Sequence, residues 1–219
     1  MWEVVTNAIE KFFEKLESCK SQDKIIVWLS GGTSLELFYD ILESVLSFTE
    51  SSLVNKLIFI YLDERNVSFD SGESNYKLTQ DLFLWNLVKM WRLKSEQIKI
   101  LTSDNYKNYL DNYNKIDIAL FWVGEDWHIA SLFPSLSNEW DYTNNYTKIS
   151  NSPKLPCERF TITPKGLEKI DLSFLFFIWE KKRWVYKKYQ LWLLEESPIS
   201  FLKNIDIITN ITEKIKRSS

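Results

Sequence analysis

The sequence predicts an α/β fold in which a mostly parallel sheet carries helices on both faces. Short apolar runs typical of strands alternate with segments whose apolar residues recur at helical spacing. Several of these runs are apolar throughout, as in strands that are buried on both faces of a sheet. Polar turns follow the runs, and ligands of such sheets bind outside the carboxyl ends of the strands.

The amino-terminal part of the chain predicts two helices around one strand. Apolar residues recur at helical spacing over residues 5–16, and residues 25–29 form an apolar run typical of a strand. Residues 30–34, Ser-Gly-Gly-Thr-Ser, then form a glycine turn. Helical spacing returns over residues 35–42, and a hydroxyl residue of the turn is available as the N-cap. The turn therefore leads into the start of a helix.

The rest of the chain continues this alternation. Strands are predicted at residues 57–62, 116–123 and 174–179, and a long helix is predicted at residues 74–91. The next helix is predicted to start near residue 180 or 181. Residues 135–145 are polar enough to form a surface loop. Because no repeat, low-complexity tract or linker divides the chain, we expect a single domain over residues 1–219.

Composition and charge narrow the function classes. The chain has 219 residues, 45% of them hydrophobic, and can bury a sizeable core. Its net charge of −3 gives no reason to expect a nucleic acid or an anionic membrane as partner. Cys19 and Cys157 match neither a disulfide framework nor a metal-binding spacing, which indicates free, buried thiols in a reducing compartment. Charges among the first apolar residues exclude a signal peptide, and no run reaches membrane-spanning length, so we expect a soluble, cytoplasmic protein.

The glycine turn could bind an anion. Gly31 and Gly32 give a permissive backbone at a helix start, where exposed N–H groups and the helix dipole favour a phosphate. Thr33 and Ser34 add two hydroxyls. The turn lacks the lysine of a nucleotide P-loop, and a strand-to-helix turn capped by Thr33 or Ser34 explains the pattern equally well.

Cations lie in two further polar segments. Asp63-Glu64-Arg65 follows a predicted strand, where Arg65 could grip a phosphate or polarise a carbonyl, although a surface salt bridge is the alternative. Lys154 and Arg159 lie in a proline-stiffened loop before another predicted strand, and they could meet the same anion or simply be solvated. The basic side chains of residues 181–188 recur at helical spacing, which indicates a solvated helix face.

The chain has one histidine, His128, in the segment 124–134 that follows a predicted strand. Histidine is the side chain best suited to proton transfer near neutral pH. Asp126, two residues earlier, could orient the ring or tune its basicity. A lone histidine is more often structural or exposed, so the pattern alone leaves both interpretations open.

Four segments together resemble the 6-phosphogluconolactonase family. They are residues 29–34, residues 63–65 with residues 74–76, residues 124–134 and residues 152–159, in the family's order and at compatible spacing. The resemblance covers roughly residues 5 to 210. It implies the modified Rossmann fold that this family shares with glucosamine-6-phosphate deaminase.

The family hydrolyses 6-phospho-D-glucono-1,5-lactone to 6-phosphogluconate in the oxidative pentose phosphate pathway, without an organic cofactor. By resemblance, His128 is the general base that activates water, Asp126 is its nearby carboxylate, and Arg65 joins them as a catalytic cation. The substrate phosphate would be bound by the remaining matched residues, which are Gly31, Gly32, Thr33, Ser34, Lys154 and Arg159. Lactone hydrolysis needs an activated water and positive or N–H density where the carbonyl oxygen gains charge, and no metal is necessary.

Two residues near His128 bear on the choice between related functions. Trp127 stands where the family carries glycine, and a positive φ there would cost a bulky residue on the order of 1–2 kcal/mol. If its side chain obstructs the substrate, the protein is instead a catalytically silent sugar-phosphate-binding homologue. Phe133 stands where deaminases carry a glutamate that assists ring opening, which favours the lactonase over the deaminase.

At the phosphate turn, Thr-Ser-Leu replaces the family's Ser-Thr-Pro and keeps both hydroxyls.

Overall fold

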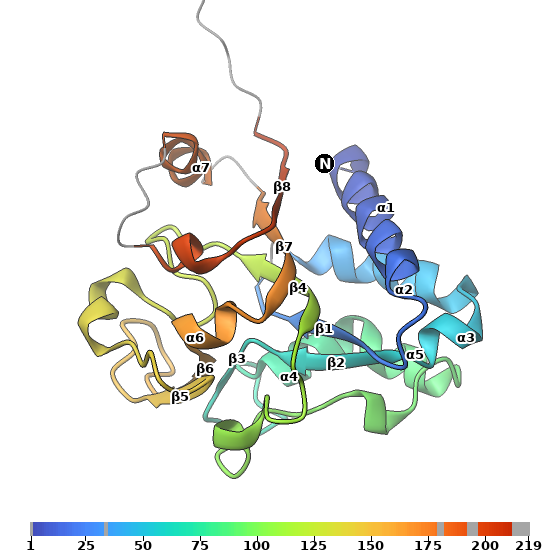
Figure 1. Cartoon of the computed structure of the whole chain (residues 1–219), viewed down its shortest axis with the longest axis horizontal. Coiled ribbons are helices and arrows are strands. Elements are labelled where there is room, and N and C mark those ends of the chain that lie inside the picture. Colours follow the sequence, from blue (N-terminus) through green and yellow to red (C-terminus); the bar gives the residue numbers. More distant parts are fainter. Residues whose placement is uncertain (1, 33–34, 179–181, 192–196, 212–219) are drawn as a thin grey trace, which may run out of the picture.

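The computed structural model describes residues 2–32, 35–178, 182–191 and 197–211 (Figure 1). Thr33, Ser34, Trp179 and the expected helix start at residues 180–181 lie outside the described residues. The helices are α1 (Trp2–Ser18), α2 (Glu36–Phe48), α3 (Ser51–Val54), α4 (Asn75–Thr79), α5 (Trp85–Lys89), α6 (Pro164–Leu167) and α7 (Arg183–Gln190). The strands are β1 (Ile25–Leu29), β2 (Leu57–Tyr61), β3 (Asp63–Arg65), β4 (Ile116–Trp122), β5 (Tyr146–Ile149), β6 (Arg159–Ile162), β7 (Ile170–Phe177) and β8 (Ile205–Thr209). Short 3₁₀ helices lie at Ser95–Gln97, Tyr106–Asn108, Pro134–Glu139 and Pro198–Phe201.

The main sheet has five strands in the order β2-β1-β4-β7-β8, and every neighbouring pair is parallel. The predicted strands correspond to β1, β2, β4 and β7, whose side chains are almost all buried. This burial explains their uninterrupted apolar runs, because a parallel strand inside an α/β protein is covered on both faces. The predicted fold class is therefore confirmed.

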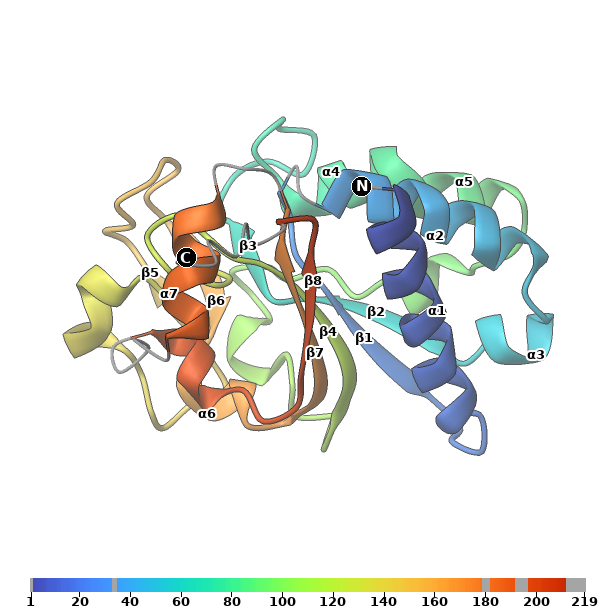
Figure 2. The same ribbon diagram turned by 90° about the horizontal axis from the view of Figure 1, so that it is seen from above.

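Helices cover both faces of this sheet. Successive side chains of a strand point to opposite faces, so Phe176 and Phe177 of β7 lie on opposite faces of the sheet. The Phe176 ring packs edge-on against Phe38 of α2, with centroids 5.3 Å apart. The Phe177 ring contacts Tyr186 of α7, with centroids 5.4 Å apart. Figure 2 accordingly shows α1 and α2 on one side of β7 and β8, and α7 on the other.

A second, antiparallel sheet of three strands, β3-β6-β5, was not predicted. It packs on the main sheet through Tyr146 of β5, whose ring meets Trp28 of β1 edge-on at 6.2 Å between centroids. The Tyr146 hydroxyl also donates to the carbonyl oxygen of Tyr61 at the end of β2. The small sheet therefore lies beside the carboxyl end of β2 and presents β3 and β6 there.

Two local expectations need correction. A third, the hydroxyl cap of α2, falls on Thr33 and Ser34, which lie outside the described residues. Helix α2 itself begins at Glu36. The helix predicted at residues 74–91 is divided, because a π-helical turn at Gln80–Leu84 joins α4 to α5. Both cysteines are free, but only Cys19 is buried, whereas Cys157 is exposed on the loop before β6.

The buried apolar residues form one contiguous core around the main sheet. Within the described residues, none of the helices combines the length and the apolar character that crossing a bilayer requires.

Candidate active site

The strand order brings three of the predicted segments to one edge of the main sheet. Strand β1 lies between β2 and β4, and all three run in the same direction. Their carboxyl ends continue into Ser30-Gly31-Gly32, into Asp63-Glu64-Arg65 and into the turn at residues 124–128. Segments far apart in the sequence therefore meet where α/β sheets bind ligands.

His128 is buried and paired with Asp126. Its Nδ1 atom lies 2.5 Å from Oδ1 of Asp126. Burial lowers the pKa of His128, and this effect outweighs the opposing influence of the Asp126 carboxylate. Partial burial works to raise the pKa of Asp126, but the hydrogen bonds and charges of His128 and Lys154 hold it well below its usual range. At neutral pH the pair is therefore a neutral imidazole beside a carboxylate.

This pairing assigns the tautomer of His128. A carboxylate can only accept hydrogen bonds, so the imidazole proton resides on Nδ1, which donates it to Asp126. The other ring nitrogen, Nε2, then carries a lone pair and can take a proton. The residue thus has the protonation state of a general base.

The turn that carries this pair depends on Gly124. A Cβ atom added at Gly124 would lie 2.0 Å from Nδ1 of His128 and 2.6 Å from Oδ1 of Asp126. The Gly124 N–H donates to the His128 carbonyl oxygen at 2.8 Å, and the Trp127 N–H donates to the Gly124 carbonyl oxygen at 3.1 Å. Close approach of the two side chains to the backbone therefore requires a glycine here.

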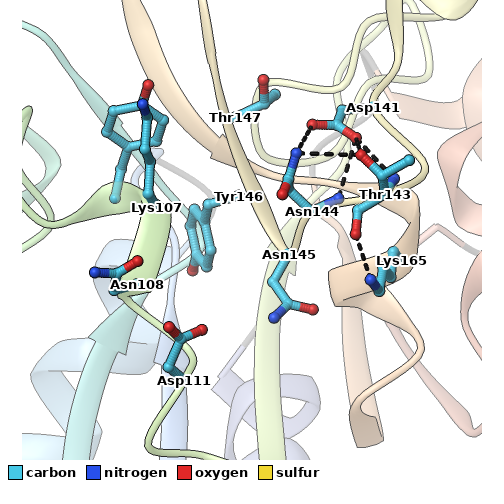
Figure 3. A pocket seen from close by; sticks show the side chains of 11 residues that line it. Lys107, Asn108, Asp111, Asp141, Thr143, Asn144, Asn145, Tyr146, Thr147 and Lys165 are labelled. Carbon is cyan, nitrogen blue, oxygen red and sulfur yellow. Dashed lines mark hydrogen bonds between the residues drawn. The ribbon is translucent and has the colours of Figure 1, made fainter.

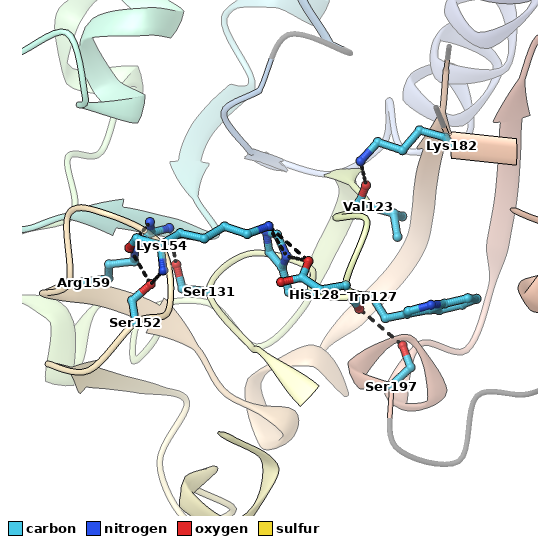
Figure 4. Close-up of polar contacts among 10 residues, drawn as sticks. Val123, Trp127, His128, Ser131, Ser152, Lys154, Arg159, Lys182 and Ser197 are labelled. Atoms are coloured by element: carbon cyan, nitrogen blue, oxygen red, sulfur yellow. Dashed lines mark hydrogen bonds and ion pairs between the residues drawn. The ribbon is translucent and has the colours of Figure 1, made fainter. Parts of the chain in front are cut away.

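Trp127 has a positive φ of 73°, as the family's glycine at this position implied. A bulky residue in this conformation costs on the order of 1–2 kcal/mol. Its side chain points away from His128 and Lys154, toward the segment that carries Ser197 (Figure 4). The Ser197 hydroxyl donates to the Trp127 carbonyl oxygen at 3.4 Å. The structure therefore gives no support to Trp127 as an obstruction.

Two aromatic rings flank His128. Phe133 stacks on the imidazole with centroids 4.6 Å apart, and Trp122 meets it edge-on at 5.2 Å. A Cβ atom added at Gly32, where φ is 114°, would lie 3.1 Å from the Trp122 ring. Trp122 thus separates the glycine turn from His128 by the width of one side chain.

The two cations of the loop before β6 take different places. Nζ of Lys154 lies 3.1 Å from Oδ1 of Asp126 and 3.4 Å from Nδ1 of His128. Arg159 is buried, and its guanidinium lies 5.7 Å from the centroid of the Phe133 ring. Most of its N–H groups donate to carbonyl oxygens of its own loop, at Lys154, Leu155 and Pro156.

A buried polar network missed by the sequence analysis links these segments. Ser131 donates from Oγ to Asp63 at 2.6 Å and accepts from Nη1 of Arg159 at 3.3 Å. Nδ2 of Asn75 donates to Asp63 at 3.1 Å, and a Cβ atom added at Gly31 would lie 2.1 Å from Oδ1 of Asn75. These residues lie in segments that carry the family resemblance, but the sequence could not show that they bond to one another, because their partners are far away along the chain.

Glu64 and Arg65 also differ from the predicted arrangement. Glu64 is buried and accepts hydrogen bonds from the backbone N–H groups of Asn75 and Tyr76 at 2.8 and 2.7 Å, so it caps α4. Burial raises its pKa, although these backbone hydrogen bonds oppose the shift. Arg65 pairs across the β3–β6 ladder with Arg159. In the described part of the chain no ion pair joins Arg65 to Asp63 or Glu64, which argues against the surface salt bridge.

Lys182 corrects the interpretation of residues 181–188 as a solvated helix face. Its side chain is fully buried, and Nζ lies 4.2 Å from the centroid of the Trp122 ring. Nζ also donates to the Val123 carbonyl oxygen at 2.7 Å (Figure 4). Lys182 therefore places a positive charge against the ring that contacts His128.

A polar cavity of about 530 Å³ lies apart from this site, between the segment around Lys107 and the segment around Asp141 (Figure 3). Asp141 accepts hydrogen bonds from Thr143 and Asn144, its own neighbours in the chain. The lining residues include none of those predicted to be functional.

Comparisons with known proteins identify the family. The chain matches the family model for glucosamine-6-phosphate isomerases/6-phosphogluconolactonase over residues 2–206. A 6-phosphogluconolactonase of Borreliella burgdorferi is 29% identical over 219 residues, which cover 92% of this chain and 91% of that relative. The probable 6-phosphogluconolactonase 4 of Arabidopsis thaliana is 31% identical over 169 residues, which cover 66% of this chain and 63% of that relative.

Solved structures share the fold. The 6-phosphogluconolactonase of Thermotoga maritima aligns with a TM-score of 0.78 at 20% identity, over 94% of both chains. The enzyme of Trypanosoma brucei aligns with a TM-score of 0.72 at 19% identity, over 94% of this chain and 92% of that chain. With the family model matched over nearly its whole length, the chain belongs to the glucosamine-6-phosphate isomerase/6-phosphogluconolactonase family.

Proposed function

We propose that the protein is a 6-phosphogluconolactonase, which hydrolyses 6-phospho-D-glucono-1,5-lactone to 6-phosphogluconate in the oxidative pentose phosphate pathway. The observation that carries the proposal is the neutral His128 paired with Asp126. This pair lies beside a glycine turn and several cations, which is the combination that hydrolysis of a phosphorylated lactone requires. We further propose that the chain acts as one domain over residues 1–219 and works in the cytoplasm.

In the proposed reaction, Nε2 of His128 takes a proton from water as its oxygen attacks the lactone carbonyl carbon. The carbonyl oxygen gains negative charge in the tetrahedral intermediate. When this intermediate collapses, the bond to the ring oxygen breaks, and the imidazolium returns its proton to that oxygen. The products are an open-chain hydroxyl and a carboxylic acid, which ionises. Asp126 stabilises the imidazolium between these two proton transfers.

We assign two further functions, stabilisation of the negative charge on the carbonyl oxygen and binding of the phosphate, to the glycine turn and the positive residues around the His128–Asp126 pair. We assign Arg65 to the developing negative charge, and we assign the phosphate to the turn Gly31-Gly32-Thr33-Ser34 together with Lys154 and Arg159. Support for the turn comes from Gly32, which lies against the same Trp122 ring that contacts His128. Support for the cations comes from the β3–β6 ladder, which places Arg65 opposite Arg159 and so brings two positive residues to one place in the small sheet.

Two observations favour the lactonase over its alternatives. Phe133 stacks on His128, so the position that carries the ring-opening acid of a deaminase holds a side chain without a proton to give. Trp127 points away from His128, which removes the reason to expect a catalytically silent binding protein.

The test is a comparison of substrates with the wild-type protein. Freshly generated 6-phosphogluconolactone, gluconolactone without the phosphate, and glucosamine 6-phosphate are supplied in parallel, with spontaneous lactone opening subtracted. We expect rapid hydrolysis of the phosphorylated lactone, a much lower kcat/KM for the unphosphorylated one, and no ammonia from the amino sugar. Ammonia release, or a corrected lactone rate of zero, would contradict the proposal.

A further inference from the structure

Lys154 lies closer to the catalytic pair than a phosphate ligand needs to. Its Nζ atom is 3.1 Å from Oδ1 of Asp126 and 3.4 Å from Nδ1 of His128. Figure 4 shows its side chain extended from the loop beside Arg159 and Ser152 across to His128. The ammonium therefore faces the Nδ1 side of the imidazole, opposite the nitrogen that would take a proton from water.

The backbone of Lys154 is fixed from two sides. Nη2 of Arg159 donates to its carbonyl oxygen at 2.9 Å, and the Ser152 hydroxyl donates to the same oxygen at 2.8 Å. The Lys154 N–H donates back to Oγ of Ser152 at 3.2 Å. Arg159 also holds the next two carbonyl oxygens, those of Leu155 and Pro156. Most of the N–H groups of Arg159 therefore hold the loop that carries Lys154.

We propose that Lys154 is a positioning residue that sets the basicity of His128 through the Asp126–His128 pair, and that Arg159 acts through Lys154 by fixing its loop. This assignment goes beyond a contribution of positive charge to phosphate binding. The expected change in lactonase activity rests on the proposed function. The expected change in the pKa of His128 in the protein without substrate does not.

Several charges face His128 from the surrounding elements. The Asp126 and Asp63 carboxylates raise its pKa, whereas the Lys154 ammonium lowers it, and burial lowers it most. The Arg159 guanidinium lies 5.7 Å from the centroid of the Phe133 ring, and Nζ of Lys182 lies 4.2 Å from that of the Trp122 ring. Among the cations, only Lys154 is within 4 Å of the imidazole in the described residues. Its removal should therefore raise the pKa of His128.

The exposure of the Lys154 and Asp126 side chains sets the size of the expected change in the pKa of His128. The side chains of Lys154 and Asp126 are each 42% exposed, so solvent screens their charges. Two unit charges about 4 Å apart in a water-like dielectric interact by roughly the equivalent of 0.8 pH unit. We expect Lys154→Met to raise the pKa of His128 by about that amount.

The chain allows a direct measurement, because His128 is its only histidine. The pKa of His128 is read by NMR titration of the imidazole carbon-bound protons in the wild type and in Lys154→Met, Lys154→Arg and Lys148→Met. Lys154 is exposed, so these substitutions should not unfold the chain. Lys148→Met is the matched control, since it removes the same charge from an exposed residue of β5 that pairs with Glu158. We expect a rise only in Lys154→Met, with Lys154→Arg restoring the value.

Arg159→Lys tests the second half of the proposal. It keeps the charge but removes the planar fork that reaches several carbonyl oxygens. If Arg159 acts through Lys154, the pKa of His128 rises in this variant, and Lys154→Met/Arg159→Lys shows no more than Lys154→Met alone. An unchanged pKa in Lys154→Met, or an equal rise in Lys148→Met, would overturn the proposal. No rise in Arg159→Lys, or a rise in the double variant equal to the sum of the two single rises, would overturn the role of Arg159.

Kinetics distinguish this role from phosphate binding alone. As a positioning residue, Lys154 sets where activity falls at acid pH, so Lys154→Met moves the acid limb of kcat/KM upward by the shift seen in the titration. A residue that only binds phosphate would raise KM at every pH and leave the limb in place, which contradicts the proposal. Because the titration uses no lactone, a shifted pKa without lactonase activity would reject the proposed function while leaving the assignment of Lys154 intact.

Discussion

His128 is defined chemically by its immediate neighbours. Asp126 fixes which ring nitrogen holds the proton, and Phe133 and Trp122 remove water from the ring and so lower its pKa. A general base works only when it is unprotonated. With these neighbours, a larger fraction of His128 stays unprotonated, and so able to act as a base, at pH values near and below the ordinary pKa of histidine.

The pH dependence of activity tests this statement. Because burial lowers the pKa of His128 from 6.5, the base should be half protonated only at a pH below 6.5. We expect the acid limb of kcat/KM to have its midpoint below pH 6.5 and activity to reach a plateau at higher pH. Initial rates between about pH 4.5 and 7.5 measure this. A midpoint above 6.5 would mean that the carboxylates dominate the environment of the ring.

Gly124→Ala should damage the site without unfolding the protein. The added Cβ atom would lie 2.0 Å from the imidazole, so His128 and Asp126 must move. Misplacement of a catalytic group by about 1 Å can cost on the order of a hundredfold in rate. The control is Gly72→Ala, because a Cβ atom there meets nothing within 4 Å. Equal kcat values for the two variants would show that the close packing at Gly124 is irrelevant to turnover.

Trp127→Gly should change the rate little. Glycine removes the strain of the positive φ but also removes a side chain that packs on the core, and these effects oppose each other in stability. Since the indole points away from His128, we expect kcat/KM to stay within a few-fold of the wild type. A large gain in kcat, measured with freshly prepared lactone, would instead identify the indole as an obstruction.

At the scale of elements, the main-sheet strands could be predicted because burial on both faces leaves a continuous apolar run. Strand β3 could not, since Asp63-Glu64-Arg65 has no apolar residue and pairs with β6, about a hundred residues later. The polar sequence Asp-Glu-Arg indicated a candidate site but did not show that each of the three residues has different partners. Asp63 anchors Ser131, Glu64 caps α4, and Arg65 faces Arg159.

The cap on α4 predicts a stability effect. Glu64→Gln places an amide N–H₂ where the buried carboxylate accepts from the N–H groups of Asn75 and Tyr76. Loss of such hydrogen bonds to a charged group should lower the free energy of unfolding by about 1–3 kcal/mol. Urea denaturation measures it, with exposed Glu96→Gln as the control. A loss no greater than that of the control would show that α4 does not depend on this cap.

For the whole molecule, the parallel order of the strands accounts for the site. The position of β1 between β2 and β4 brings together turns that lie near residues 31, 63 and 126 in the sequence. The sequence predicted that these turns lie close together, because ligand-binding groups of parallel sheets lie at the carboxyl ends of the strands. It could not reveal Lys182, whose basic surroundings in the sequence resemble a solvated helix and whose burial under Trp122 depends on the complete fold.

The central claim is that one buried histidine performs the proton transfers. Loss of a general base should cost about a hundredfold to ten-thousandfold in rate. The most direct measurement is single-turnover hydrolysis of fresh 6-phosphogluconolactone by the wild type and by His128→Ala, corrected for spontaneous opening, together with the Kd of 6-phosphogluconate for both. The predicted result is a fall of that size in rate with a nearly unchanged Kd. Equal corrected rates would contradict the account.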